Sequence, residues 1–149
     1  IRDSVASRGL GDVYKRQRYP YFSVCTTSTH DMNPLRAWWE ENRELSERFY
    51  REVLGMEGDA PRTCEPWICR RIVDMHLRSP AMLAILPLQD WLATDAALRS
   101  PHADRERINI PAAPRYYWRY RMHLTLEELL RQEPFNATLR EMIIAGGRR

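Results

Sequence analysis

The sequence contains only two segments with the character of a buried β-strand, and a long helical stretch separates them. Residues 19–27 (YPYFSVCTT) are rich in aromatic and β-branched side chains, and residues 82–86 (MLAIL) form a continuous apolar run. Strands that are joined by helices pair in parallel, and a parallel sheet is covered by helices on both faces. Two strands are too few for such a sheet. We therefore expect an α/β fold of which this chain supplies only a part.

Helical periodicity and helix-boundary signals account for much of the remaining sequence. Asn33 is a candidate N-cap with Pro34 at the first helical position, and Thr125 and Glu128 match a capping box. Gly55 is a typical helix end. Residues 99–114 are predicted to form a long polar loop. The predicted helices cover residues 35–54, 65–77, 88–97, 125–132 and 136–145.

The first 17 residues differ in character from the rest of the chain. They hold the only lysine, Lys15, and two of the six glycines, and they show no sustained apolar period. The string GDVYKRQ within them resembles translated adapter sequence found at the ends of unrelated environmental gene fragments. We therefore expect residues 1–17 to be non-native and residues 18–149 to carry the fold.

Arginine supplies 22 of the 23 Lys and Arg side chains, and a cluster of aromatic residues at 116–120 has arginines around it. Arginine binds phosphate well and aromatic rings stack on bases, so a small nucleic-acid-binding module is one hypothesis. The 20 interspersed acidic residues and the net charge of only +3 oppose it. A bias of the source toward arginine codons is the simpler interpretation.

His30 and Asp31 follow the first predicted strand directly, at the start of a loop. Catalytic side chains of α/β folds sit on loops after the carboxyl ends of strands. A carboxylate accepts hydrogen bonds from sugar hydroxyls or serves as an acid or base, and a neutral imidazole offers one donor and one acceptor. The alternative is a loop aspartate that caps the next helix, beside a packed histidine.

The three cysteines suit a reducing compartment, because an odd number does not suggest a disulfide framework. Cys64, Cys69 and His76 raise the hypothesis of a small zinc protein. The spacing is too wide and a fourth ligand is missing, so buried free thiols are the favoured interpretation. No apolar run approaches the ~20 residues of a membrane span, and no glycine-rich phosphate loop is present.

Four blocks of sequence stand out: residues 25–31 (CTTSTHD) with 35–41 (LRAWWEE), residues 86–90 (LPLQD), residues 107–111 (RINIP) and residues 117–121 (YWRYR). Taken together and in order, they resemble the 4-α-glucanotransferases, the amylomaltases or disproportionating enzymes of glycoside hydrolase family 77. The long bacterial members related to the plant cytosolic enzyme are the most similar subgroup. Tyr117 and Tyr120 depart from the asparagine and the second tryptophan of the last family block.

The resemblance implies a C-terminal part of a TIM (β/α)8 barrel, about strands 7 and 8 with their helices. It implies retaining transfer of α-1,4-glucan segments, in which one carboxylate is the nucleophile and another the acid/base. By motif position, Asp31 and His30 are the catalytic pair that holds the hydroxyls of the reacting sugar. Asn109 matches a glucan-contacting residue, and Gln89 is a weaker substrate-binding candidate.

The nucleophile and the acid/base belong to upstream strands of that family, and no motif for either is present here. The fragment alone is therefore expected to be inactive. The implied partners are malto-oligosaccharides, α-1,4-glucans and the upstream remainder of the barrel, with no nucleic acid and no membrane. No cofactor and no metal are implied, and the expected location is cytoplasmic.

Overall fold

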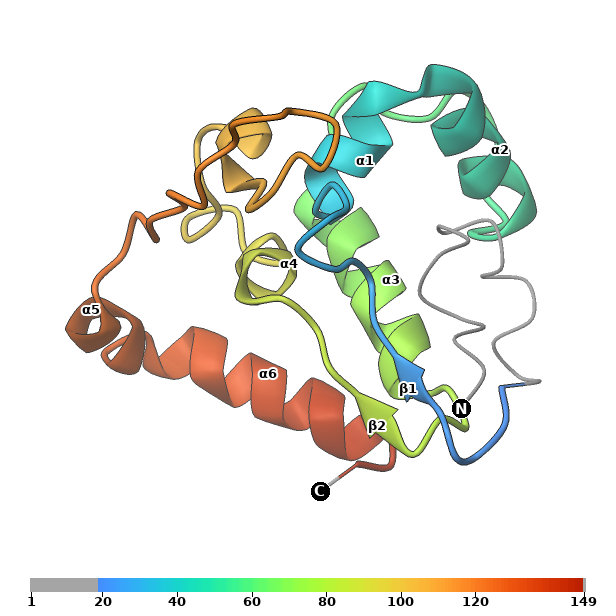
Figure 1. The fold of residues 1–149 in the computed structure, drawn as a ribbon. Coiled ribbons are helices and arrows are strands. Elements are labelled where there is room, and N and C mark those ends of the chain that lie inside the picture. The colour runs from blue at the N-terminus through green and yellow to red at the C-terminus, as the bar shows by residue number, and fades with distance from the viewer. Residues whose placement is uncertain (1–18, 149) are drawn as a thin grey trace.

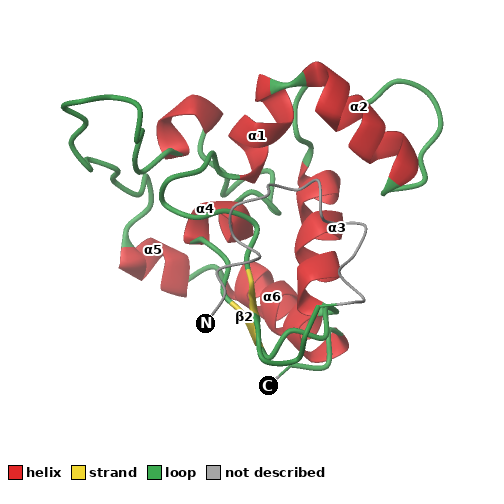
Figure 2. Ribbon diagram, turned by 45° about the vertical axis from the view of Figure 1, so that its right-hand side comes forward, coloured by secondary structure: helices red, strands yellow, loops and turns green. Residues whose placement is uncertain are grey.

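The computed structural model describes residues 19–148, so the segment 1–17 that the sequence predicts to be non-native lies outside the described residues. Helices dominate residues 19–148, and the only sheet in this part of the chain has two strands (Figure 2). In chain order the elements are β1 (Val24–Cys25), α1 (Leu35–Glu41), α2 (Arg43–Glu52), α3 (Pro66–Leu77), β2 (Leu83–Ala84), α4 (Leu88–Leu92), the 3-10 helix η2 (Ala103–Glu106), α5 (Leu126–Leu130) and α6 (Glu133–Ala145).

The two strands pair in parallel, with Val24 opposite Leu83 and Cys25 opposite Ala84. The parallel α/β arrangement expected from the sequence is thus present, but both strands are much shorter than predicted. Each strand has a paired neighbour on one side only within residues 19–148. Val24 in β1 is 46% exposed and Leu83 in β2 is 45% exposed, so apolar residues of both strands face outward without a covering layer. This is the surface expected of part of a larger sheet.

The single helix predicted over residues 35–54 is wrong, because the chain forms two helices that meet at Asn42. The backbone of Asn42 is extended (φ −133°, ψ 101°), and its side chain accepts a hydrogen bond from the Leu45 backbone N–H. Asn42 therefore caps α2, as asparagine readily does. Beyond α2 the chain turns through Gly55 at φ 67°, a left-handed conformation that favours glycine.

The predicted N-cap role of Asn33 is also wrong. The residue before α1 is Pro34, and no side chain of that position caps the helix. The Leu35 backbone N–H instead donates to Oδ1 of Asp90, at 2.8 Å. Asn33 uses its side chain for Glu41 and Arg107. The start of α1 is therefore fixed by a residue far along the chain.

Elsewhere the sequence signals hold with shifted bounds. The α3 helix begins at Pro66, one residue after the predicted start, and the Thr125–Glu128 capping box forms completely at the start of α5. The α4 helix ends at Leu92, earlier than predicted, and α6 begins before residue 136, with a proline in its first turn. The predicted polar loop over residues 99–114 contains η2.

Within residues 19–148, two hydrophobic cores hold the helices together. The larger lies between α1, α2 and α3, at the top and centre of Figure 1, and the smaller joins α4 to α6. The α6 C-terminus also packs on the end of α3, where a Cβ added at Gly146 would lie 2.8 Å from Cβ of Leu77. Only glycine permits this approach. In residues 19–148 no helix has the length and apolar character to span a membrane. The members of the larger core include Leu35, Trp39, Phe49, Ile68 and Ile72, and those of the smaller are Leu92, Leu98 and Phe135.

Candidate functional site

The loop that follows β1 is closed at both ends by one buried carboxylate. Asp90, in the first turn of α4, is 1% exposed and accepts hydrogen bonds from the hydroxyls of Thr27 and Ser28 on Oδ2. Its Oδ1 accepts from the backbone N–H of Leu35. These three partners lie on either side of residues 29–34. Burial raises the pKa of Asp90, and the three hydrogen bonds oppose that rise.

His30 and Asp31 occupy the exposed tip of this loop. Their side chains are 53% and 49% exposed, and Nε2 of His30 lies 3.4 Å from Oδ1 of Asp31. The loop follows the carboxyl end of a parallel strand, which is where α/β folds place their functional side chains. The geometry therefore offers an accessible carboxylate with an imidazole beside it.

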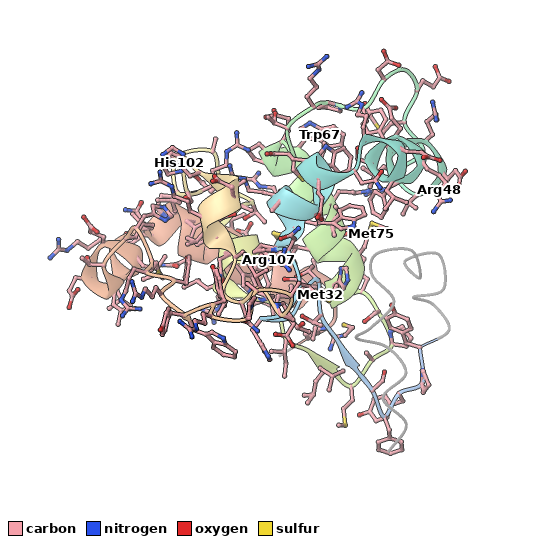
Figure 3. The ribbon with its side chains drawn as sticks, turned by 45° about the horizontal axis from the view of Figure 1, so that its top comes forward. Met32, Arg48, Trp67, Met75, His102 and Arg107 are labelled. Atoms are coloured by element: carbon pink, nitrogen blue, oxygen red, sulfur yellow. The ribbon has the colours of Figure 1, made fainter. Side chains whose placement is uncertain are left out.

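Asn109 joins the pair from a distant segment of the chain. Its backbone N–H donates to the His30 carbonyl oxygen at 3.1 Å, and its side-chain amide donates to Oδ1 of Asp31 at 2.6 Å. Arg107 secures this segment, with Nε donating to the Asn109 carbonyl oxygen at 2.9 Å and Nη1 donating to Oδ1 of Asn33 at 2.8 Å. Figure 3 labels Arg107 and, from the loop, Met32; Nη2 of Arg107 donates to the carbonyl oxygen of Asp31, the residue before Met32, at 3.4 Å. Three of the four predicted site residues thus form one cluster.

Gln89, the fourth predicted residue, lies apart from this cluster. It is 4% exposed, and its amide donates to the carbonyl oxygen of Glu106 at 3.2 Å. In this structure the Gln89 side chain therefore holds the chain shortly before Asn109 and does not point to solvent beside Asp31.

A buried ion pair adjoins that contact. Glu106 is 2% exposed, and its Oε1 lies 3.4 Å from Nη1 of Arg36. Burial raises the pKa of Glu106 to about 7; Arg36 opposes this rise, and the negative charge of Asp90 adds to it. Oε2 of Glu106 and Nε of Arg36 have no hydrogen-bond partner among the described residues. Burial of the Tyr120 phenol raises its pKa, and the negative charge of Glu106 adds to that rise.

Aromatic side chains border the cluster. The Trp118 ring lies against the His30 imidazole, with ring centroids 4.9 Å apart and an interplanar angle of 38°. Trp118 is 57% exposed and the neighbouring Tyr117 is 65% exposed. The Arg119 guanidinium carbon lies 4.9 Å from the centre of the Tyr117 ring. The accessible polar groups therefore have an accessible apolar surface beside them.

The cysteines do not assemble a metal site with His76. The Cys64 and Cys69 sulfurs are 3.4 Å apart and both residues are fully buried. Burial raises the pKa of Cys64 well above its usual range, and the neighbouring Cys69 adds to that rise. His76 is turned elsewhere, with Nδ1 2.8 Å from the Ile72 carbonyl oxygen. Within residues 19–148 no three metal-ligating side chains come close enough to hold an ion.

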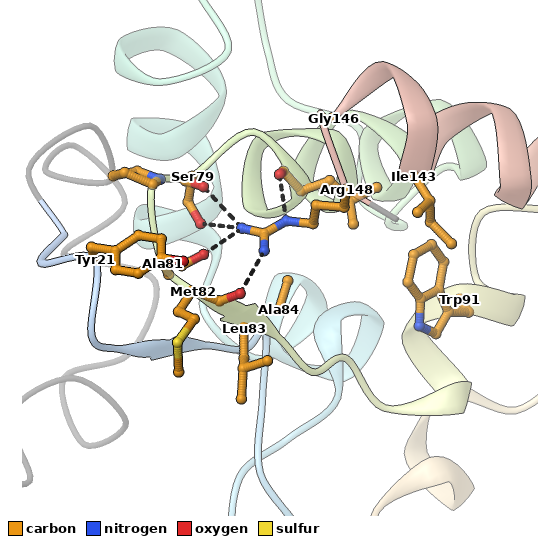
Figure 4. Close-up of a pocket in the computed structure, with 13 residues that line it drawn as sticks. Tyr21, Ser79, Ala81, Met82, Leu83, Ala84, Trp91, Ile143, Gly146 and Arg148 are labelled. Carbon is orange, nitrogen blue, oxygen red and sulfur yellow. Dashed lines mark hydrogen bonds between the residues drawn. The ribbon is translucent and has the colours of Figure 1, made fainter.

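A pocket of about 590 Å³ lies at the opposite end of the strands (Figure 4). Its lining includes Tyr21, Ser79 and Trp91, and the Arg148 side chain crosses it. Arg148 donates to the carbonyl oxygens of Leu77 (2.6 Å), Ser79 (2.9 Å), Ala81 (2.9 Å) and Met82 (3.4 Å). The guanidinium therefore fastens the chain after α6 to the turn between α3 and β2, and this pocket is structural.

Two residues of the cluster's support are missed by sequence reasoning. Asp90 is the last residue of the LPLQD block, but no local pattern indicates that it binds the loop after β1. Glu106 lies in a predicted polar loop, and charged residues are rarely buried. The one available signal is that Asp90 adjoins the site candidate Gln89, and Glu106 adjoins Arg107, the first residue of the RINIP block.

Comparison with known proteins gives a consistent result. Residues 4–126 match the family model described as 4-alpha-glucanotransferase. The 4-alpha-glucanotransferase DPE2 of Oryza sativa subsp. japonica is 42% identical over 131 residues, which cover 88% of this chain and 14% of that protein. The 4-alpha-glucanotransferase of Chlamydia caviae is 28% identical over 135 residues, which cover 90% of this chain and 25% of that protein.

A solved structure shares the fold. The amylomaltase from Streptococcus agalactiae, in complex with acarbose, superposes with a TM-score of 0.65 at 18% sequence identity. The match covers 93% of this chain and 24% of that chain. This chain thus spans a quarter or less of the length of these relatives.

Proposed function

The chain belongs to the 4-alpha-glucanotransferase family, and from this premise we propose that it is the C-terminal part of such an enzyme. In this proposal β1 and β2 are about strands 7 and 8 of a TIM barrel, residues 18–149 belong to the barrel, and residues 1–17 are non-native. The exposed apolar strand residues and the short two-stranded sheet support the barrel assignment.

The proposed reaction is retaining transfer of α-1,4-glucan segments between malto-oligosaccharides. Asp31 and His30 hold hydroxyls of the sugar in the reactive subsite, and Asn109 orients the Asp31 carboxylate and contacts the glucan. Hydrogen bonds that sugar hydroxyls donate to a carboxylate assist catalysis when they strengthen as the ring distorts toward an oxocarbenium ion. The observation that carries this proposal is the 2.6 Å contact from the Asn109 amide to the exposed Asp31 carboxylate.

The upstream remainder of the barrel completes the site in this proposal, because it supplies the nucleophile and the acid/base. No cofactor takes part, and the enzyme works in the cytoplasm. Gln89 remains a proposed glucan contact of second rank, since its amide is engaged with Glu106. Membership of this family favours the glucanotransferase over the nucleic-acid-binding alternative.

Two incubations with maltotriose test the proposal. The full-length enzyme is expected to release glucose and form longer glucans, whereas this chain alone forms neither, because two catalytic carboxylates are absent. Clear turnover by the chain alone would sink the fragment assignment.

A matched pair of variants of the full-length enzyme tests the role of Asp31. Asp31→Ala is expected to lower turnover by orders of magnitude with an unchanged melting temperature. Asp104→Ala, at an exposed position of η2, serves as the control and keeps full turnover. Near-wild-type turnover of Asp31→Ala would refute the assigned role.

A further inference from the structure

Trp118 is the most exposed of the five tryptophans, although its ring contacts the imidazole of a candidate site residue. It is 57% exposed, compared with 42% for Trp67 and 1% for Trp39. Removing a tryptophan ring from water is favourable, so an exposed ring that is fixed beside polar functional groups indicates a surface that a ligand covers. The contact with His30 places this surface at the site and not at a remote position.

The segment that carries Trp118 has no regular secondary structure, yet it is tied to the site. Residues 111–124 begin two positions after Asn109, whose backbone and side chain both bond to the His30–Asp31 pair. Arg107 adds bonds to Asn33 and to the Asn109 carbonyl oxygen. Trp118 therefore lies against His30 on a segment whose beginning is held at the site by hydrogen bonds.

The polar groups and the ring together define the chemistry of the ligand. Asp31 and Asn109 present hydrogen-bonding groups, and Trp118 presents an apolar face, which matches a sugar ring with a hydroxyl rim and an apolar C–H face. An anionic ligand is disfavoured by the Asp31 carboxylate. Of the nearby cations, Arg107 already donates to Asn33, Asn109 and the Asp31 carbonyl oxygen, at 2.8, 2.9 and 3.4 Å, and the Arg119 guanidinium lies over the Tyr117 ring.

We propose that Trp118 forms the apolar wall of the sugar-binding subsite whose polar wall is His30, Asp31 and Asn109, and that its ligand is a glucose unit of an α-glucan. This inference rests on the proposed function and adds a binding residue to it. Covering the ring with the C–H face of the sugar removes apolar surface of both from water. Trp118 is a binding residue in this scheme, and it also restricts the orientation of the His30 imidazole through the ring contact.

Kinetics of the full-length enzyme with maltotriose test the inference. Trp118→Ala is expected to raise KM by about tenfold, the effect of losing one aromatic contact and its buried area, with a smaller change in kcat. Trp118→Phe keeps an aromatic face and is expected to recover most of the affinity. Trp67→Ala is the matched control, because Trp67 is also exposed but packs on Tyr50, and its KM stays at the wild-type value. A KM for Trp118→Ala within twofold of wild type overturns the inference.

A second measurement does not depend on the folding of the alanine variant. In the full-length enzyme labelled with 5-fluorotryptophan, the ¹⁹F resonance missing from the Trp118→Phe spectrum belongs to Trp118. That resonance is expected to move when maltotriose is added, while the Trp67 resonance stays in place. A Trp118 resonance that does not move refutes the stacking. The same result is expected if the rest of the barrel covers this ring, and it refutes the proposal in that case as well. If the wild-type enzyme converts no maltotriose, the proposed function has failed instead.

Discussion

Replacing Asp90 with alanine removes the only acceptor that the structure shows for three buried donors at the ends of the loop that carries His30 and Asp31. The donors are the hydroxyls of Thr27 and Ser28 and the backbone N–H of Leu35, and all three residues are 5% exposed or less. A buried donor that loses its partner costs about 1–3 kcal/mol. The substitution also removes the desolvation penalty of the buried Asp90 carboxylate, whose pKa is raised by burial, and this offsets part of that cost.

We therefore expect Asp90→Ala to destabilise the closed loop by about 3–5 kcal/mol, and Asp90→Asn, which keeps an acceptor for the Leu35 N–H, by about half as much. Amide hydrogen exchange of the full-length enzyme measures this local loss of stability. A peptide covering residues 28–36 is expected to exchange at least ~100-fold faster in Asp90→Ala. Turnover falls with it, because Asp31 loses its fixed position.

The control is Asp104→Ala, which removes an exposed carboxylate from η2 and leaves exchange in the same peptide unchanged. Exchange in Asp90→Ala within about threefold of wild type would show that this carboxylate does not hold the loop. The reasoning from the three hydrogen bonds would then be refuted.

Three further outcomes follow from the contacts described. Asn109→Ala is expected to lower kcat/KM by about 10–100-fold, because Asp31 loses a charge-assisted hydrogen bond of about 1.5–3 kcal/mol, and steady-state kinetics checks this. Glu106 has a pKa of about 7 against 4.5 when unfolded, so the folded state binds the proton more tightly and stability falls as pH rises from 4.5 to 7. Denaturant titrations of Glu106→Gln and wild type at several pH values should show that the wild type loses stability relative to the variant across this interval; a constant difference contradicts the assignment. Arg148→Ala is expected to cost about 2–3 kcal/mol in urea unfolding, because four carbonyl oxygens lose their donor, while the exposed Arg140→Ala costs under ~0.5 kcal/mol.

Local signals in the sequence predict local structure well. The Thr125–Glu128 capping box acts within one helical turn and is confirmed, and α3 and α6 end at residues 77 and 145, as predicted. The Asn33 cap and the break at Asn42 are exceptions. The break is the more instructive of the two, because apolar residues keep helical spacing on both sides of it. Periodicity does not reveal where a cap interrupts a helix, since the residues on both sides pack on the same core.

The site divides in the same way. His30 and Asp31 are found from their position after a strand, and Asn109 from the resemblance of its block. The capping of α1 by Asp90 and the burial of Glu106 depend on residues more than 50 positions away, so no local pattern contains them. The strands are shorter than predicted for a related reason, because strand length is set by paired neighbours, and each strand has only one in the described part of the chain.

The parallel pairing of β1 with β2 also has a consequence for the order in which the molecule assembles. All of α1, α2 and α3 lie between the two strands in the chain, and these helices share a core that needs no strand residue. Contacts between near neighbours in sequence form faster than pairing across a long crossover. We expect the helical cluster to condense first, so that the strand ends, and the loop that Asp90 closes, become ordered last.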